Sequence, residues 1–542
     1  MQKSQLQNLF VGQEPIKQRQ EILIKQNQQL LNEITNSLPL EAQAIYSLNK
    51  WTSDEESLAA DINLLQKLNN KTKESFILLR PWRIWATKLY LHELLERIED
   101  YKDLVAKETV QSKNSSTNKY LNTSLFLRLV THPRYRITLF FLVLPDRIFV
   151  VRIGWLLFDF RVIYIKRLQL RELVQSWHQK VQNVNYKRDD LTNKIELFNL
   201  LGSEHLSQDN TNNQRDFLTN YDSIIQKINN NKDFKFELDS VMNKFKNDSK
   251  NISKEIAELL EISDLLNDLP KRIKAITIVP DDILHGFPFA TIIHQGQYLI
   301  ENYSLSIAYQ TNKIKLSSPI PSKPEKALVV GVSQPASIKD RYFQTLPGVK
   351  AEIKKIEDWF KQLHFPRIIL ENNPQNQTHQ EPSKQAVLEN LVDATLVHIA
   401  CHGIFEYNRP DQSGLVLVAN SNAEILSLRE LSNLDLKQLR HITLSSCWAA
   451  DHFILPGRWI ISVPETLWRS GTQSILGCLW QVSDKIAVPF MADFYENLKR
   501  FPRDKALQLT QIKCLKGQLP DCQENTHNPF FWAGFNLYGD GG

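Results

Sequence analysis

Two short, β-branched and apolar runs constrain the fold of this chain most strongly. The first spans Thr395–Ala400 and stops at Cys401-His402-Gly403, and the second spans His441–Ser446 and stops at Cys447. Continuous apolar runs of this length are typical of strands that are buried on both faces of a sheet. In open α/β sheets, reactive groups collect just beyond the carboxyl ends of such strands. The pattern therefore predicts a histidine and a cysteine at two strand ends.

Strand and helix patterns alternate along the chain from Lys326 onward. Besides the two runs above, strands are predicted at Lys326–Ser333, Arg367–Glu371, Gln473–Val482 and Phe531–Tyr538, and helices at Val349–Leu363, Lys384–Leu391, from Pro464, and at Lys485–Arg500. Strands separated by helices of roughly 10 to 15 residues indicate an α/β fold with a mostly parallel sheet covered on both faces.

The residues before Lys326 divide into a helical part and a β-rich part. From Gln5 to about Lys107 the composition favours helix, which predicts three or four packed helices. β-rich runs separated by turn signals follow at Arg136–Leu144, Arg147–Ile153 and Phe158–Ile165, and predict an antiparallel meander. The stretch Ser207–Asn251 is poor in apolar residues, which predicts long exposed helices or a partly mobile insertion.

Two segments are candidate linkers between domains. Val110–Thr123 is rich in Ser, Thr and Asn, and Ser317–Lys326 contains three prolines. These linkers divide the chain into regions at 1–110, 124–318 and 325–542, with a helical insertion at about 171–268.

Charge and cysteine content argue against several classes of function. A net charge of +5, from 65 basic and 60 acidic residues, is small for 542 residues, so direct nucleic-acid binding is not expected. Five cysteines without paired spacing favour a reducing cytoplasm. Met1–Gln20 lacks the apolar core of a signal peptide, and no uninterrupted apolar span of about 18 residues occurs, so we expect neither secretion nor membrane insertion.

His402 and Cys447 together suggest nucleophilic catalysis. A thiol attacks as thiolate, and an imidazole within hydrogen-bonding reach accepts its proton and later protonates the leaving amine. Cys447 follows His402 by 45 positions, close to the roughly 50 that separate these residue types in caspases. The backbone N–H groups of Gly403 and Cys447 would hold the developing oxyanion, an interaction worth about 3 kcal/mol per donor. The pattern therefore favours a cysteine peptidase with a His402/Cys447 dyad.

These residues also have structural interpretations, and another kind of site competes with the dyad. Taken alone, His402 would be interpreted as an ordinary core or loop histidine, and Cys447 as a small buried hydrophobic residue. His398, Cys401 and His402 could ligate zinc, but His398 falls inside a predicted strand and no second Cys or His pair follows at suitable spacing. No glycine-rich phosphate loop occurs, and we expect neither a metal nor a cofactor.

A series of sequence blocks resembles the CHAT domain, a caspase- and separase-like peptidase domain usually found in bacteria joined to helical repeats. In chain order the blocks are Thr277–Asp281, Leu284–Phe289, Tyr298–Glu301, Leu346-Pro347-Gly348 with Glu352, Val397–Gly403, Ser413-Gly414-Leu415, Leu444–Cys447, Leu479–Asp484 and Phe531–Phe535. The resemblance covers roughly Arg136 to Tyr538.

The resemblance implies roles for particular residues. His402 matches the family's general base, and Cys447 matches its nucleophile. Asp484 is similar to an acidic residue that, in the separase branch, lies beneath the first substrate pocket and favours a basic substrate residue; its structural alternative is a helix N-terminal aspartate. The family usually has Ala-Cys-Glu-Thr-Gly at the nucleophile, whereas this chain has Ser446-Cys447-Trp448-Ala449-Ala450. Trp448 would therefore reshape the cleft or mark a specialised substrate.

The resemblance also implies an architecture and an activity. Region 124–318 would be an inactive caspase-like half and region 325–542 the active half, while the helices of 1–110 would be a sensor or a docking surface for an activating protein. The expected activity is that of a cytoplasmic endopeptidase that cuts one or a few partner proteins, bound as an added strand, in a defence or cell-fate response. The alternative is a catalytically inactive adaptor that only binds peptide. A third hypothesis is a protease that matures by self-cleavage within Ser207–Asn251.

Overall fold

The computed structural model describes residues 55–73, 91, 94–95, 132–155, 157–184, 232–310, 326–338, 341–343, 345–372, 379–404, 406, 410–420, 422–446, 453–454, 460–482, 484–522 and 526–542. The predicted linker Val110–Thr123, all of Ser317–Lys326 except Lys326, and much of the predicted helical region 1–110 and of Ser207–Asn251 lie outside these residues.

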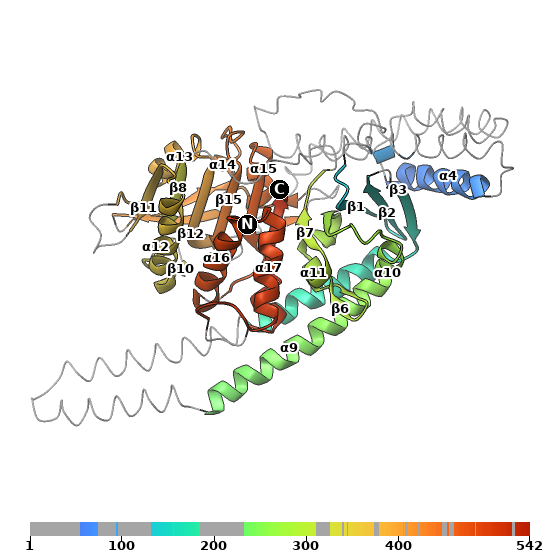
Figure 1. The fold of residues 1–542 in the computed structure, drawn as a ribbon, viewed down its shortest axis with the longest axis horizontal. Helices are drawn as coiled ribbons and strands as arrows, with labels where there is room; N and C mark the ends of the chain where they lie inside the picture. Colours follow the sequence, from blue (N-terminus) through green and yellow to red (C-terminus); the bar gives the residue numbers. More distant parts are fainter. Residues whose placement is uncertain are drawn as a thin grey trace, which may run out of the picture.

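One continuous, mostly parallel sheet forms the centre of the fold and is flanked by helices (Figure 1). The strand order is β11-β8-β12-β15-β18-β19-β7-β4-β1-β2-β3, and the hairpin β13–β14 is attached to β12, which makes thirteen strands among the described residues. They are β1 (Arg136–Val143), β2 (Ile148–Gly154), β3 (Leu157–Ile163), β4 (Ala275–Val279), β7 (Ser304–Ile307), β8 (Ala327–Gly331), β11 (Arg367–Glu371), β12 (Leu396–Ile404), β13 (Gly414–Ala419), β14 (Asn422–Ser427), β15 (His441–Ser446), β18 (Ser474–Cys478) and β19 (Phe535–Gly539). The predicted fold class is confirmed.

Helices and short strands surround this sheet. The helices are α4 (Glu55–Lys73), α9 (Lys232–Leu259), α10 (Ile262–Leu266), α11 (Leu299–Asn302), α12 (Pro347–Gln362), α13 (Lys384–Leu391), α14 (Leu428–Leu431), α15 (Val463–Arg469), α16 (Asp484–Leu498) and α17 (Arg503–Leu515), and residues 167–184 are also helical. The short strands are β5 (Ile293–His294), β6 (Gln297–Tyr298), β9 (Ala336–Ile338), β10 (Arg341–Phe343), β16 (Phe453–Ile454) and β17 (Ile460–Ile461). Helices α12, α16 and α17 pack side by side in that order (Figure 1). Within the described part of the chain, no helix has the length and apolar character needed to cross a membrane.

The last predicted strand begins later than expected. Phe531–Tyr538 was expected to be extended throughout, but Pro529–Phe531 forms a 3₁₀ turn and β19 starts at Phe535. The carboxamide oxygen of Asn528 accepts a hydrogen bond from the Phe530 N–H at 3.0 Å and caps this turn. A side-chain cap of this kind competes with the extended backbone that an aromatic run otherwise favours.

The strands β1, β2 and β3 form the predicted antiparallel meander. Strand β1 is buried along its whole length, and its residues alternate between two apolar clusters. Ile137 and Phe141 belong to the main core, whereas Phe140 belongs to a second cluster together with Ile62 and Leu65 of α4. Because strand side chains alternate between faces, α4 covers the face of the meander opposite to the main core.

The sheet has two parts, which meet between β19 and β7. One part contains β11, β8, β12, β15, β18 and β19, and the other contains β7, β4, β1, β2 and β3. One register pair, Tyr538↔Ile307, joins these two described strands, whereas the neighbouring pair β18–β19 has five. Helix α17 packs against both β19 and β7. Much of the contact between the two parts therefore comes from side chains of α17.

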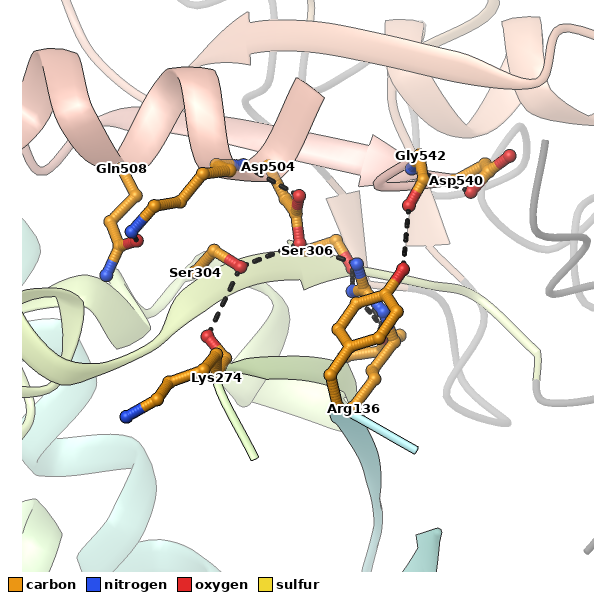
Figure 2. A network of polar contacts seen from close by, with 11 residues as sticks. Arg136, Lys274, Ser304, Ser306, Asp504, Gln508, Asp540 and Gly542 are labelled. Carbon is orange, nitrogen blue, oxygen red and sulfur yellow. Dashed lines mark hydrogen bonds and ion pairs between the residues drawn. The ribbon is translucent and has the colours of Figure 1, made fainter. Parts of the chain in front are cut away.

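A buried ion pair fastens α17 to the strands beyond β19 (Figure 2). The guanidinium Nη2 of Arg136 lies 2.6 Å from Asp504 Oδ2, and the two side chains are 1% and 3% exposed. Arg136 Nη1 donates to Thr277 Oγ1 at 3.1 Å and to Ser306 Oγ at 3.3 Å, and Ser304 Oγ donates to the Asp504 carboxylate at 2.8 Å. A charge taken out of water is tolerated when it is paired and hydrogen-bonded in this way.

A second set of buried polar groups crosses the other part of the sheet. His398 Nε2 lies 2.9 Å from Glu352 Oε1, and His398 Nδ1 lies 3.1 Å from Tyr495 Oη. Tyr495 Oη donates to Thr443 Oγ1 at 3.1 Å. Thr443 Oγ1 in turn lies 3.1 Å from Nε2 of His441, whose Nδ1 lies 3.0 Å from Ser474 Oγ. This chain of hydrogen bonds therefore links helices α12 and α16 to strands β12, β15 and β18.

The order of donors along this chain of hydrogen bonds follows from two of its members, Tyr495 and His441. Burial raises the pKa of Tyr495 well above its usual value, so its hydroxyl keeps the proton that it donates to Thr443. Its lone pair then accepts from Nδ1–H of His398, whose Nε2 lies within hydrogen-bonding distance of Glu352 Oε1. Burial lowers the pKa of His441 well below its usual value, so this ring is neutral and can accept from Thr443 while donating to Ser474. Every member of the chain is thus satisfied.

We predict that breaking the Arg136–Asp504 pair destabilises the protein strongly. Arg136→Met leaves the Asp504 carboxylate buried without its partner, which should cost about 3–5 kcal/mol in the free energy of unfolding. Arg429→Met serves as the control, because it removes a pair with Asp411 whose side chains are 69% and 35% exposed and which should contribute at most about 1 kcal/mol. Chemical denaturation measures the free energy of unfolding of both variants. Equal losses would contradict the structural importance of the buried Arg136–Asp504 pair.

We predict that stability falls as the pH drops below about 6.5, partly because of His441. The folded protein keeps this ring neutral, whereas the unfolded chain protonates it near its ordinary pKa of about 6.5. The unfolded state therefore binds the extra proton, and each such histidine can lower the free energy of unfolding by up to about 1.4 kcal/mol per pH unit. Burial lowers the pKa of His132 to about 4, which acts in the same direction. Chemical denaturation between pH 7 and 5 measures how the free energy of unfolding changes with pH. This change should be less steep for His441→Asn than for the wild type, and an equal steepness would refute this account.

Candidate active site at the carboxyl ends of two strands

The two apolar runs singled out in the sequence form neighbouring parallel strands. They are β12 and β15, and their register runs from Leu396↔His441 to Cys401↔Ser446. Both strands are buried through most of their length. Their carboxyl ends therefore lie at the same edge of the sheet.

His402 lies at this edge, on the part of β12 that continues beyond β15. There β12 pairs antiparallel with β13, with His402 opposite Val416 and Gly403 opposite Leu415. The His402 side chain is half-buried, and its ring centroid lies 5.3 Å from that of Phe343 on β10, with an angle of 44° between the rings. The hairpin β13–β14, which sequence reasoning did not identify, thus extends the backbone pairing of the histidine strand.

The remaining predicted site residues are described only in part. Cys447 lies outside the described residues, and the last one before it is Ser446. Asp484 is the first residue of α16, but its side chain also lies outside what the structure describes. The Oγ atom of Ser446 is buried and has no hydrogen-bond partner among the described residues. The catalytic role of Cys447 and the binding role of Asp484 therefore remain predictions.

A small cavity of about 30 Å³ lies beneath the ends of β12, β15 and β18. It is lined by Leu346, Val349, Glu352, Cys401, Ser445, Ser446, Cys478, Trp480, Val482, Ala487 and Phe535. Most of this wall is apolar, and Glu352, Ser445 and Ser446 supply its polar side chains. The space is sufficient for a water molecule. Sequence reasoning missed this cavity, although Glu352 stands in one of the recognised sequence blocks.

His398, one of the three residues of the competing zinc hypothesis, is hydrogen-bonded within the core. Both ring nitrogens of His398 are occupied, one by Glu352 and the other by Tyr495. Cys401 is 1% exposed and forms no disulfide. Among the residues with described positions, no three His, Cys, Asp or Glu side chains are grouped to hold a metal ion. His398 acts instead as the core histidine that its place inside a strand suggested.

Comparison with solved structures finds the following similarities. A crystal structure of the Saccharomyces cerevisiae separase–securin complex at 3.0 Å aligns with a TM-score of 0.51 and 11% identity over 89% of this chain and 37% of the separase-complex chain. A 2.6 Å structure of the same complex gives a TM-score of 0.49 and 10% identity over the same shares. Caspase-1 from Spodoptera frugiperda gives 0.23 and 12% identity, over 40% of this chain and 91% of that chain. The first of these alignments supports a shared fold, and this chain spans 37% of that neighbour's length.

Comparison of sequences identifies the family. No curated protein matches the sequence. The family model of the CHAT domain, however, matches residues 251–540, which is more than half of the chain and includes β4, β7 and every strand from β8 to β19. This protein belongs to the CHAT domain family.

Proposed function

We propose that this protein is a cysteine endopeptidase in which His402 is the general base and Cys447 the nucleophile. The observation that carries the proposal is the register pair Cys401↔Ser446. His402 follows the first of these residues, and Cys447 follows the second. Neighbouring strands lie about 4.8 Å apart, and each proposed catalytic residue is one Cα–Cα step of about 3.8 Å from the pair. This pairing brings His402 and Ser446, the residue before Cys447, to the same edge of the sheet, which supports the proposed dyad.

The proposed reaction follows the chemistry of a thiol and an imidazole. His402 accepts the Cys447 proton, and the thiolate attacks the carbonyl carbon of the scissile peptide bond. The N–H groups of Gly403 and Cys447 hold the oxyanion of the tetrahedral intermediate. The intermediate collapses when the protonated imidazole gives its proton to the leaving amine, and water then hydrolyses the thioester, with His402 again acting as the base.

We further propose that the substrate is a segment of a partner protein that binds as an added strand. Asp484 would favour a basic residue before the cleaved bond. The fold neighbour crystallised as a separase–securin complex holds a protein partner, which supports a protein partner here too, and the helices of region 1–110 would be the docking surface for an activator. The sparse cysteines favour action in the cytoplasm, where cutting one or a few proteins would suit a defence response.

Replacing Cys447 with Ala should abolish cleavage. His402→Ala should lower the rate at least about 1000-fold, because members of a catalytic dyad act as one unit. The assay incubates the full chain with a peptide library and identifies new termini by mass spectrometry. Cys522→Ser is the matched control, because Cys522 is a partly exposed thiol far along the chain from β12 and β15, and its loss should leave the rate unchanged. Cleavage by Cys447→Ala would refute the proposal, and peptide binding without cleavage by the wild type would establish the adaptor instead.

Asp484→Asn should change the substrate preference. If the carboxylate faces a basic substrate residue, kcat/KM for peptides with Lys or Arg before the cut should fall about 10- to 100-fold, since the lost charge pair is desolvated. Peptides with a neutral residue at that position should be cut as before. An equal loss for both kinds of peptide would show that Asp484 acts only at the N-terminus of α16, where an acidic residue contributes about 0.3–1 kcal/mol to helix stability.

A further inference from the structure

The buried polar chain beneath the site joins the same two strands that carry the proposed dyad. His398 and Thr443 are direct register partners on β12 and β15. His398 precedes His402 by four residues, and Thr443 precedes Cys447 by four residues. The hydroxyl of Tyr495 bridges this pair, at 3.1 Å from His398 Nδ1 and 3.1 Å from Thr443 Oγ1.

The apolar side chains of these strands do not by themselves specify the register. In a half-buried strand, a shift by one residue moves every apolar side chain to the solvent face, and this penalty fixes the register. The first six residues of β12 are all buried, and five of the six residues of β15 are buried. Since apolar side chains are acceptable on both faces here, a shifted register costs less burial than in a one-sided sheet. A polar contact that forms in one register can then decide between alternatives.

The hydrogen bonds of Tyr495 to His398 and Thr443 are a contact of this kind, which forms in one register of the two strands. The side chains of His398, Thr443 and Tyr495 are all nearly or fully buried, so a shift of either strand would leave buried polar atoms without partners. Tyr495 is held in place by aromatic contacts with Trp359 and Phe360 of α12, at centroid distances of 5.0 and 6.1 Å. Glu352 of the same helix holds the other side of His398. The bridge is therefore anchored to two helices and does not follow the strands if they slide.

We propose that Tyr495, acting through His398 and Thr443, is a register clamp that positions His402 and Cys447 opposite one another. The inference rests on the proposed dyad and assigns a role to residues that touch neither substrate nor the reacting atoms. Buried hydrogen-bonded groups are known to select one register among several in helical assemblies. The clamp applies the same physics to two parallel strands.

The test measures how fast iodoacetamide alkylates Cys447 in the full chain between pH 5 and 9, with each cysteine followed separately by mass spectrometry. A thiol paired with an imidazole reacts at lower pH than a free thiol, whose pKa is about 8.5. Tyr495→Phe keeps the ring and removes the bridge, and Thr443→Val removes the hydroxyl. Both should slow alkylation at pH 7 about 10-fold, which corresponds to a rise of about one unit in the thiol pKa. His402→Ala should slow it at least as much.

Two controls separate positioning from general stability. Thr443→Ser keeps the bridging hydroxyl and should react within about two-fold of the wild type, since the hydrogen bond is retained. Thr277→Val removes a buried threonine hydroxyl from β4, in the other part of the sheet, and should leave the alkylation profile unchanged even if it lowers the melting temperature.

Each other outcome identifies what has failed. If His402→Ala slows alkylation but Tyr495→Phe and Thr443→Val match the wild type, the dyad stands and the clamp is overturned. If Thr277→Val slows it as much as Thr443→Val, the effect is loss of stability, and the clamp is again overturned. If His402→Ala leaves the profile unchanged, the proposed dyad itself falls, and the clamp falls with it.

Discussion

The parallel pairing of β12 with β15 is the interaction on which the rest of the site depends. It brings together two strands whose carboxyl ends carry His402 and lead to Cys447, although these residues are 45 positions apart. Backbone hydrogen bonds hold the strands together but are indifferent to which residues face each other. The side chains must therefore choose the register, and in strands buried on both faces the polar ones have most influence.

Buried polar groups recur at the places where this fold needs one arrangement and no other. The chain from Glu352 to Ser474 links two helices to three strands, and the Arg136–Asp504 pair links α17 to strands beyond β19. Such groups add little net stability when satisfied, yet each becomes costly when its partner moves away. Buried polar groups therefore favour one arrangement of the helices and strands that they join, because any displacement leaves some of these groups without partners.

The two parts of the sheet illustrate the same principle on a larger scale. Backbone pairing between β19 and β7 amounts to one register pair, so the ladder alone would hold the parts together weakly. Helix α17 compensates with side chains that reach both sides. Gln508 donates to the backbone oxygen of Ile300 at 2.7 Å, and Gln511 donates to that of Phe535 at 3.0 Å. The region before β8 thereby becomes part of the body that supports the site.

The sequence by itself determined the α/β class, most strands and helices, and the two buried strands that carry the site, because periodicity and β-branched content act over a few neighbouring residues. The predicted end of the first run at Ala400 was wrong, because pairing with β13 carries β12 on to Ile404. The sequence also placed His398 inside a strand and so in the core. Only the tertiary structure decided the order of the strands, the hairpin beside His402 and the partners of His398. The Arg136–Asp504 bond spans 368 positions and the His398–Tyr495 contact spans 97. No local pattern records such pairs, because they arise only when elements distant in the sequence pack against one another.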